Sequence, residues 1–239
     1  MTLLELIEYL RESILDDTGG HGIDWTTIDK ADDEAQLLRW TNEQLTSYIN
    51  EAINQVYRRI LPAHGYFTEF DISVTATNHT YVYDPRILRI TWARLVTEDK
   101  DLERTDLQDL QLCNRHWRNG TGTPDKYLID FTSGSIRLVD IPIASDTLEL
   151  EVNRLPLVPL DWASNNLSPE AALRSEFQIL MLHYAAFLAF GKDEANSLDP
   201  TSSDRHLALF NKTFPESANA YSDTRKRRTN NRTVRYGGL

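Results

Sequence analysis

The hydrophobic pattern of this chain changes its period twice, and this change restricts the folds open to it. Up to about residue 60, apolar residues recur every three or four positions, as in amphipathic helices. From Phe67 to Val152 they mostly alternate with polar residues, as in strands. Helical spacing returns after the proline-rich segment 155–160. We therefore predict an α+β fold: a helical bundle with an inserted antiparallel β sandwich or small barrel, followed by an extended basic C-terminal arm.

The helices before the β module have clear start signals. Thr2 and Glu5 have the spacing of a capping box, and the Asp- and Gly-rich run 16–20 ends this first helix. Thr41 and Gln44 have the same spacing at the start of a second helix, which ends before the first proline. An apolar stripe marks its buried face: Leu45, Tyr48, Ile49, Ala52, Ile53, Val56, Tyr57 and Ile60.

The middle of the chain contains short alternating segments separated by turn residues, which is typical of antiparallel sheets. The segments predicted as strands are 70–74, 81–83, 88–93, 127–131, 136–139 and 148–152. The turn run 132–135 is a hairpin signal, and a short helix is expected over 105–116. Leu88, Ile90 and Trp92 are predicted to share one face of their strand.

Two helices are predicted after the β module. Ser168, followed by proline and glutamate, is expected to open the first of them, because proline suits the first helical position. The segment 177–190 is apolar on almost every side, which predicts a central helix of the bundle or a subunit contact. A last helix is expected from about Asp204, with Pro215 kinking or splitting it.

Charge is distributed unevenly along the chain. The whole sequence has 36 acidic and 25 basic residues, a formal charge of −11, yet the last fifteen residues contain six bases and no acid. The remaining residues therefore carry 36 acids against 19 bases, a formal charge of −17. A cationic tail with so few apolar residues does not fold alone. We divide the chain into N-terminal helices (1–65), an inserted β module (66–160), C-terminal helices (161–224) and an extended basic arm (225–239).

No catalytic or metal-binding motif stands out. The six histidines never fall into a zinc-binding spacing, and phosphate-cradle and nucleophile-elbow patterns do not occur. Cys113 and His116 lie one helical turn apart, which leaves open a thiol nucleophile with its base, but a half-buried cysteine beside a surface histidine explains the pair as well. We expect a protein that is not an enzyme and has no cofactor or metal site.

Neither a signal peptide nor a membrane association is expected. The N-terminus lacks a basic stretch before its apolar residues. The longest apolar run, 179–190, is shorter than the ~20 residues that cross a bilayer as a helix.

The basic arm allows three interpretations. The first is a solubilising end, and the second is a segment that binds nucleic-acid phosphate with an affinity that falls as salt rises. The third is a segment that becomes ordered when it docks on an acidic partner protein. In the docking interpretation two side chains would fill pockets and the bases would pair with acids. The candidate docking residues are Arg225, Lys226, Arg227, Arg228, Arg232, Val234, Arg235 and Tyr236.

Several segments, taken in order, resemble one known family. Trp40-Thr41 leading into Leu45 and Tyr48-Ile49-Asn50-Glu51-Ala52 is similar to the helix start "W-[ST]-x-x-x-L-x-x-Y-I-N-x-A", and Gly122-Thr123-Pro124-Asp125-Lys126-Tyr127 is similar to the hairpin entry "G-x-P-x-x-Y". Leu138-Val139-Asp140-Ile141-Pro142, then Leu148 to Val152 and Leu155-Pro156, resemble the ending "L-x-P-x-P … L-x-L-x-Y … P". A late helix with Tyr184-Ala185-Ala186 and then Lys192-Asp193 also fits. These features resemble the head–tail connector (adaptor) proteins of tailed bacteriophages.

The chain departs from that family pattern at two places. The segment 19–31 is unusually long, and Ile141 stands where the pattern often has a proline.

The resemblance implies a structural virion protein with a helical bundle and an inserted β domain. Such a protein forms a ring, commonly of twelve subunits, beneath the portal, joins the capsid vertex to the tail, and lets DNA pass during ejection without specific binding. The implied partners are the portal protein and a tail protein (nozzle or stopper), and the implied location is the head–tail interface of a virion assembled in the host cytoplasm.

Within such a ring, the apolar helix and the aromatic residues Tyr81, Tyr83 and Trp92 would supply subunit contacts, and the arm would reach the portal. The alternative from a different class is a nucleic-acid-associated protein that uses the basic arm to contact phosphate.

Overall fold

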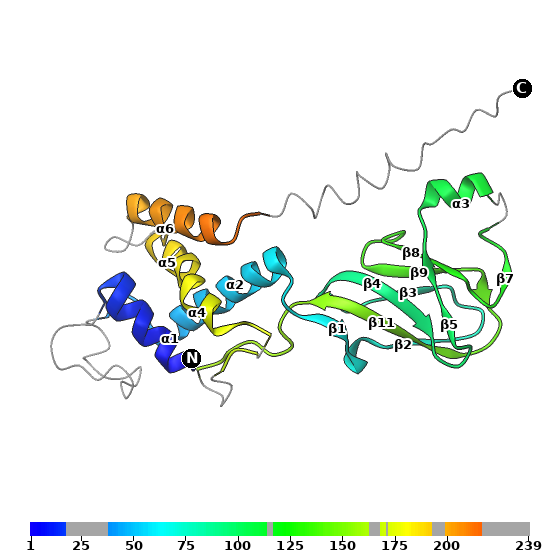
Figure 1. The fold of residues 1–239 in the computed structure, drawn as a ribbon, viewed down its shortest axis with the longest axis horizontal. Helices are drawn as coiled ribbons and strands as arrows, with labels where there is room; N and C mark the ends of the chain where they lie inside the picture. The colour runs from blue at the N-terminus through cyan, green and yellow to red at the C-terminus, as the bar shows by residue number, and fades with distance from the viewer. Residues whose placement is uncertain (18–37, 114–116, 163–167, 171, 193–198, 217–239) are drawn as a thin grey trace, which may run out of the picture. The chain divides into compact units, whose positions relative to one another are not determined.

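The fold is α+β, with helices and strands in separate parts of the chain. The computed structural model describes residues 1–17, 38–113, 117–162, 168–170, 172–192 and 199–216 of the 239 (Figure 1). They form two compact units, each described here by itself. The helical unit contains the described residues of Met1–Ile60, Leu160–Pro169 and Arg174–Leu239, and the β unit contains those of Leu61–Pro159 and Glu170–Leu173. The predicted α+β class is confirmed.

The helical unit begins at the two capping boxes that the sequence indicates. Its elements are α1 (Leu3–Tyr9), the π-helix η1 (Leu10–Leu15), α2 (Asn42–Ile60), α4 (Ser175–Leu180), α5 (Leu182–Phe190) and α6 (Pro200–Thr213). The Thr2 hydroxyl accepts from the Glu5 N–H at 3.3 Å, and the Glu5 carboxylate accepts from the Thr2 N–H at 2.8 Å. Thr41 and Gln44 exchange the equivalent two bonds, both at 3.2 Å. Both predicted helix starts are therefore confirmed.

Helix α5 lies among the other helices, as its apolar composition predicts. It contacts α2, α4, α6 and η1. Its buried residues are Leu182, Ala185, Ala186 and Ala189. Three alanines on a buried face allow neighbouring helices to approach closely, and Gly191 ends the helix.

The predicted start of the third helix is wrong. Ser168 lies in a bend outside any helix, and α4 begins only at Ser175. The reason is a tertiary contact in the β unit, where the Glu170 carboxylate accepts from Arg154 Nη1 at 2.8 Å and from the Leu157 N–H at 2.5 Å. The glutamate expected in a first helical turn is instead used to bind the end of a strand.

Helix α6 also differs from its predicted bounds. It begins at Pro200, because the Asp199 carboxylate caps it by accepting from the N–H groups of Thr201 and Ser202, both at 3.1 Å. It ends at Thr213, before the proline that was expected to kink it. Phe210 and Phe214 are buried, as predicted for its inward face.

The β unit consists of two main sheets around a shared core. Its elements are β1 (His64–Tyr66), the 3-10 helix η3 (Thr68–Phe70), β2 (Ile72–Val74), β3 (Thr80–Val82), β4 (Ile87–Leu95), β5 (Lys100–Asp101), β6 (Glu103–Arg104), α3 (Leu107–Cys113), β7 (Thr121–Gly122), β8 (Lys126–Ile129), β9 (Ser135–Val139), β10 (Ile141–Pro142) and β11 (Asp146–Arg154). One sheet has the order β1-β11-β4-β5 with β2 also on β11, and the other has the order β3-β9-β8-β6. The pairing is antiparallel as predicted, except that β6–β8 and the small β7–β10 pair are parallel.

Apolar residues of both sheets meet in this core. It includes Ile90 and Leu150 from the first sheet and Tyr127, Ile136 and Leu138 from the second. The β8–β9 hairpin and the buried face of β11 are as predicted.

The predicted face of Trp92 is wrong, because β4 contains two irregularities. Its pairing with β11 shifts register at Glu151/Val152 and at Asn153/Arg154. Each shift adds an unpaired residue to β4 and reverses the alternation of its side chains. The buried positions are Ile87, Ile90, Ala93 and Leu95, whereas Leu88 and Trp92 lie outside the core, so the predicted shared face holds only for Ile90.

Candidate functional site

The predicted docking arm lies outside the described residues, and so does His116. This applies to all eight candidate residues: Arg225, Lys226, Arg227, Arg228, Arg232, Val234, Arg235 and Tyr236. The predicted interpretations of these segments stay predictions. The described part of the chain nevertheless contains surfaces with the composition of binding sites.

Of the three aromatic residues predicted at subunit contacts, Tyr81 belongs to the core. Its side chain is buried, and its hydroxyl donates to the Asn78 carbonyl oxygen at 2.8 Å. Tyr83 packs against the same core, and its hydroxyl donates to the Asp130 carboxylate at 2.7 Å. Burial and this hydrogen bond raise the pKa of Tyr83 to about 12. Trp92 alone of the three lies on a strand face outside the core.

The outer face of the β3-β9-β8-β6 sheet, which points away from the shared core, carries a cluster of arginine and aromatic side chains. Ile136 and Leu138 of β9 enter the shared core, so Arg137 between them stands on the outer face. Trp117 is buried beside it in a second small core with Leu110, Leu128 and Val139. The contacts of this second core hold the indole ring of Trp117 in one position on the outer face.

The guanidinium groups lie over the aromatic rings. Arg137 is 4.9 Å from the ring centroids of both Trp117 and Phe131, and Arg118 is 5.4 Å from that of Trp117. The two rings meet edge to face, with centroids 5.9 Å apart. We call Trp117, Arg118, Phe131 and Arg137 the arginine–aromatic cluster. Cation–π contacts of this kind stabilise a guanidinium without neutralising its charge.

No carboxylate of the described residues neutralises this cluster. Neither Arg118 nor Arg137 takes part in an ion pair there, and the buried Nε of Arg137 has no hydrogen-bond partner. Burial, and then the charge of Arg118, lower the pKa of Arg137. Burial, and then the charge of Arg137, likewise lower the pKa of His79, whose buried Nδ1 also lacks a partner. The cluster is therefore a pair of cations, of which Arg137 is partly buried and Arg118 is exposed, and it is able to bind an anion.

Exposed apolar side chains accompany these cations. Phe131 is 39% exposed, and Val82 of the edge strand β3 is 81% exposed. Val82 lies opposite Ser135 of β9, on the outer face. Arginine and aromatic side chains are the residues most enriched among the strongest contacts of protein interfaces.

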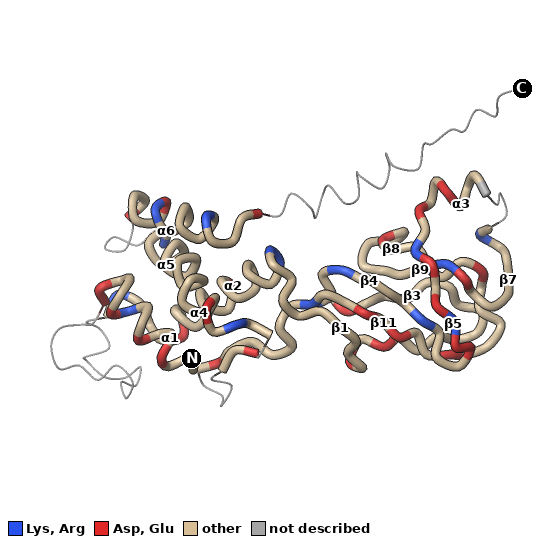
Figure 2. Tube along the Cα trace, viewed as in Figure 1, with Lys and Arg blue, Asp and Glu red and all other residues tan. Residues whose placement is uncertain are grey.

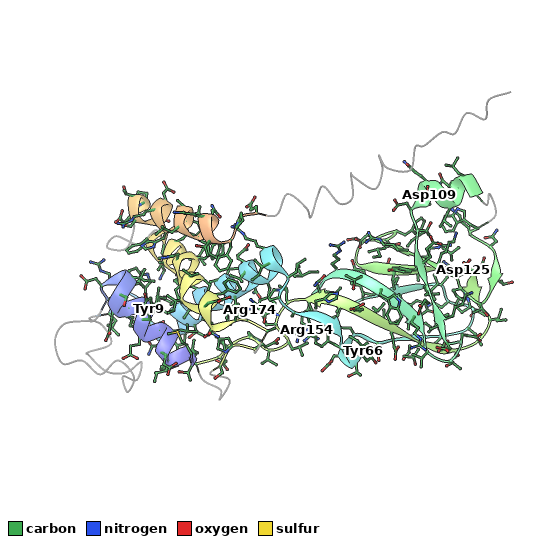
Figure 3. The ribbon with its side chains drawn as sticks, in the orientation of Figure 1. Tyr9, Tyr66, Asp109, Asp125, Arg154 and Arg174 are labelled. Atoms are coloured by element: carbon green, nitrogen blue, oxygen red, sulfur yellow. The ribbon has the colours of Figure 1, made fainter. Side chains whose placement is uncertain are left out.

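Acidic residues lie on and near β5 and β6, two short strands that are consecutive in the sequence and form an edge of the first and of the second sheet. Glu98, Asp101, Glu103 and Asp125 are exposed there, and we call them the acidic edge. The Glu103 N–H donates to the Asp125 carbonyl oxygen at 2.9 Å, so these two residues are neighbours. Figure 2 shows acidic residues gathered around β5, and Asp125 is labelled in Figure 3.

The cations near this edge have partners already. Arg94 pairs with Asp99, Lys126 pairs with Glu103 at 3.8 Å, and Lys100 donates to the Thr123 carbonyl oxygen at 3.5 Å. Among the residues that the structure describes, no ion pair involves the other acids of the edge, Glu98, Asp101 and Asp125.

The helical unit holds a buried arginine that the sequence analysis did not identify. Arg11 is fully buried, forms an ion pair with Asp17, and donates through Nη2 to the Trp40 carbonyl oxygen at 2.6 Å and to Asn42 Oδ1 at 2.9 Å. Burial lowers its pKa, against the charge of Asp17. Arg11 thereby joins the end of η1 to the start of α2. The available signal was its position four residues after Ile7, on the apolar face of the first helix.

His183, on the apolar helix α5, is paired with a second histidine. His183 on α5 and His206 on α6 stack with ring centroids 5.2 Å apart and Nδ1 atoms at 3.1 Å. Phe190 stacks on His206 at 5.6 Å. Both histidines are half-buried, so this pair joins two helices rather than presenting a ligand.

Neither a metal site nor a membrane-spanning helix is present among the described residues. In that part of the chain, no three histidine, cysteine, aspartate or glutamate side chains are grouped so as to hold a metal ion. None of the helices described has the length and apolar character to span a bilayer.

Comparison with known families gives one match along nearly the whole sequence. The model of the SU10 adaptor protein family matches residues 1–235. No curated protein matches the chain.

Proposed function

We propose that this chain, which belongs to the SU10 adaptor protein family of phage head–tail adaptors, forms a ring beneath the portal and connects the capsid vertex to the tail. The family match over residues 1–235 carries the proposal, since it covers both the helical and the β unit. A phage adaptor is a structural component of the virion. The ring, its number of subunits and the passage of DNA are proposals that go beyond the family match.

The charge of the chain supports a channel that does not hold DNA. Apart from the fifteen-residue basic tail, the chain has a formal charge of −17. A wall of that sign repels phosphate, so DNA passes without being retained. A ring also repeats every contact, which allows firm attachment from individually weak contacts.

The basic arm, 225–239, is proposed to dock on the portal. Its six bases and its lack of acids favour an acidic partner surface, while Val234 and Tyr236 are the apolar side chains that would anchor it. The portal is the expected partner on one side of the ring, and a tail protein is expected on the other.

Reconstitution with the portal tests this function. The purified chain is mixed with portal rings of the same phage, and the complexes are imaged by electron microscopy. We expect a ring of adaptor seated under each portal, and a variant lacking 225–239 that keeps its circular dichroism spectrum but no longer binds. Portal rings that stay bare with the full chain would contradict the adaptor role. Unchanged binding of the truncated variant would contradict only the docking role of the arm.

The charge of the arm also supports the alternative of a nucleic-acid-associated protein. Filter binding to duplex DNA at two salt concentrations separates the two, because binding through six bases falls steeply as salt rises. Salt-sensitive DNA binding that is lost with the arm, together with bare portals, would favour the alternative.

A further inference from the structure

We infer that the arginine–aromatic cluster of one copy binds the acidic edge of the next copy, head to tail. This inference rests on the proposed ring and names the surfaces that close it. The cluster consists of Trp117, Arg118, Phe131 and Arg137, and the edge consists of Glu98, Asp101, Glu103 and Asp125. Both belong to the β unit.

Among the described residues, no carboxylate forms an ion pair with the arginines of the cluster. Arg137 is partly buried, and burial, followed by the like charge of Arg118, lowers its pKa. A partner carboxylate at this position would bind two guanidinium groups with charge-assisted hydrogen bonds.

The acidic edge supplies carboxylates of the required kind. Glu98, Asp101 and Asp125 are exposed and take part in none of the ion pairs among the described residues. Exposed carboxylates on loops and short strands are free to meet a partner, whereas the cations beside them are already bound. The two surfaces are therefore complementary in charge.

The sheet order separates the cluster from the acidic edge within the β unit. Arg137 lies on β9, facing outward, whereas Glu103 lies on β6, two strands away at the edge of the same sheet. One copy thus presents both surfaces at once. A contact between two different surfaces of identical chains is heterologous, which is the type that generates closed rings.

A second copy fits the cluster better than a nucleic acid does. Affinity for nucleic acid grows with the number of phosphates neutralised, and the cluster offers two arginines on a chain whose residues outside the tail sum to −17. The exposed Phe131 and Val82 beside the arginines also suit a protein surface. Nucleic acid binding is kept as an outcome of the test.

Sign reversal on each surface tests the contact. The variant R118E/R137E makes the cluster acidic, and the variant E98K/D101K/D125K makes the edge basic. Self-association is measured by sedimentation at low salt and by counting copies on portal rings. We expect each variant alone to associate about 100-fold more weakly than the unmodified chain, since contacts between like charges replace attractive ones.

An equimolar mixture of the two variants gives the decisive result. The acidic cluster of one variant meets the basic edge of the other, and the converse contact is also between opposite charges. We expect the mixture to assemble again, in an alternating ring with an even number of copies. The single variant R118E repeats the first test without disturbing the packing of Arg137, because Arg118 is exposed. The control R174E/K212E changes the same charge on exposed residues of the helical unit and should assemble normally.

Three outcomes would overturn the inference. The first is normal assembly of both variants, provided that their melting temperatures match that of the unmodified chain; the ring would then stand while this contact falls. The second is failure of the mixture to assemble although both variants are folded. The third is normal assembly of R118E/R137E with loss of salt-sensitive binding to a single-stranded oligonucleotide, which would assign the cluster to nucleic acid. An unmodified chain that stays monomeric on portal rings would contradict the proposed ring itself.

Discussion

Removing the buried carboxylate Asp17 should destabilise the helical unit far more than an average surface substitution does. Asp17 is 4% exposed, pairs with the fully buried Arg11, and accepts from the Arg39 N–H at 2.9 Å. In Asp17→Ala the guanidinium stays buried and, among the described residues, keeps the Trp40 and Asn42 oxygens as acceptors. Breaking a buried ion pair at one partner costs about 3–5 kcal/mol, and we expect a loss in this range.

Replacing Arg11 separates the contribution of its charge to stability from the contribution of its packing. Arg11→Met fills a similar volume with apolar atoms but leaves Asp17 with the Arg39 N–H as its remaining partner. The double variant R11M/D17A has no buried charge left at this position. We therefore expect it to be more stable than the sum of the two single losses predicts, with a coupling free energy of about 1–3 kcal/mol.

Hydrogen exchange followed by mass spectrometry is the suitable assay, because it reports the opening of the helical unit and of the β unit separately. Peptides from α2 report the opening free energy of the helical unit, and peptides from β11 serve as the internal control. The reasoning is refuted if Asp17→Ala changes protection in α2 by less than about 1 kcal/mol, or if the single losses simply add.

Three further predictions concern other contacts. Burial lowers the pKa of His183 and His206, so the unfolded chain binds protons more readily than the folded one. The stability that this pair gives α5 and α6 is therefore present above pH ~6.5 and is lost as the pH falls through the lowered pKa values. In H183Q/H206Q the melting temperature should depend less on pH between pH 5 and 8. Glu170→Ala should destabilise the β unit by about 2 kcal/mol, because it leaves the largely buried Arg154 without its carboxylate; urea unfolding measures this, and a change below about 0.5 kcal/mol would contradict it. Gly134→Ala should cost about 1 kcal/mol because Gly134 has φ +70°, whereas Gly134→Asn should cost less; equal thermal stability of the two variants would contradict the conformational explanation.

Local rules in the sequence predicted the elements that depend on local contacts alone. The two capping boxes, at Thr2 and at Thr41, need only residues within four positions of each other. The β8–β9 hairpin follows from the turn run 132–135, and the alternating apolar residues of β11 predicted its buried face. In each case the information lies within one segment, so no distant partner is needed to read it.

The predictions that were wrong depend on distant partners. Ser168 and the following proline have a helix-start pattern, but Glu170 binds Arg154 and so keeps this segment with the β unit. Trp92 was assigned to the wrong face because the irregular pairing of β4 with β11 is not encoded in the period of β4 itself. Tertiary pairing overrides local preference at both places.

The arginine–aromatic cluster shows the same limit for a binding surface. Alternation along β9 is enough to place Arg137 on the outer face, since Ile136 and Leu138 on either side are apolar. Nothing in the sequence indicates that Trp117, twenty positions earlier, lies beneath it. Without that contact the two arginines look like ordinary solvated charges.

In the proposed ring, electrostatics give the cluster a physical reason to stay unpaired in the single chain. Copies that each carry −17 outside the arm repel one another, so a ring needs contacts that lower this repulsion at the subunit boundary. A carboxylate within the chain that neutralised Arg137 would stabilise the monomer and remove that contact. In the proposed contact, Arg137, which is partly buried and forms no ion pair among the described residues, keeps its interaction energy for the neighbouring copy, whose Glu98, Asp101 and Asp125 likewise form no ion pair among the described residues. Assembly should accordingly weaken as salt rises, because the exposed half of this contact, Arg118 with the edge carboxylates, is screened within about 10 Å at 0.1 M ionic strength.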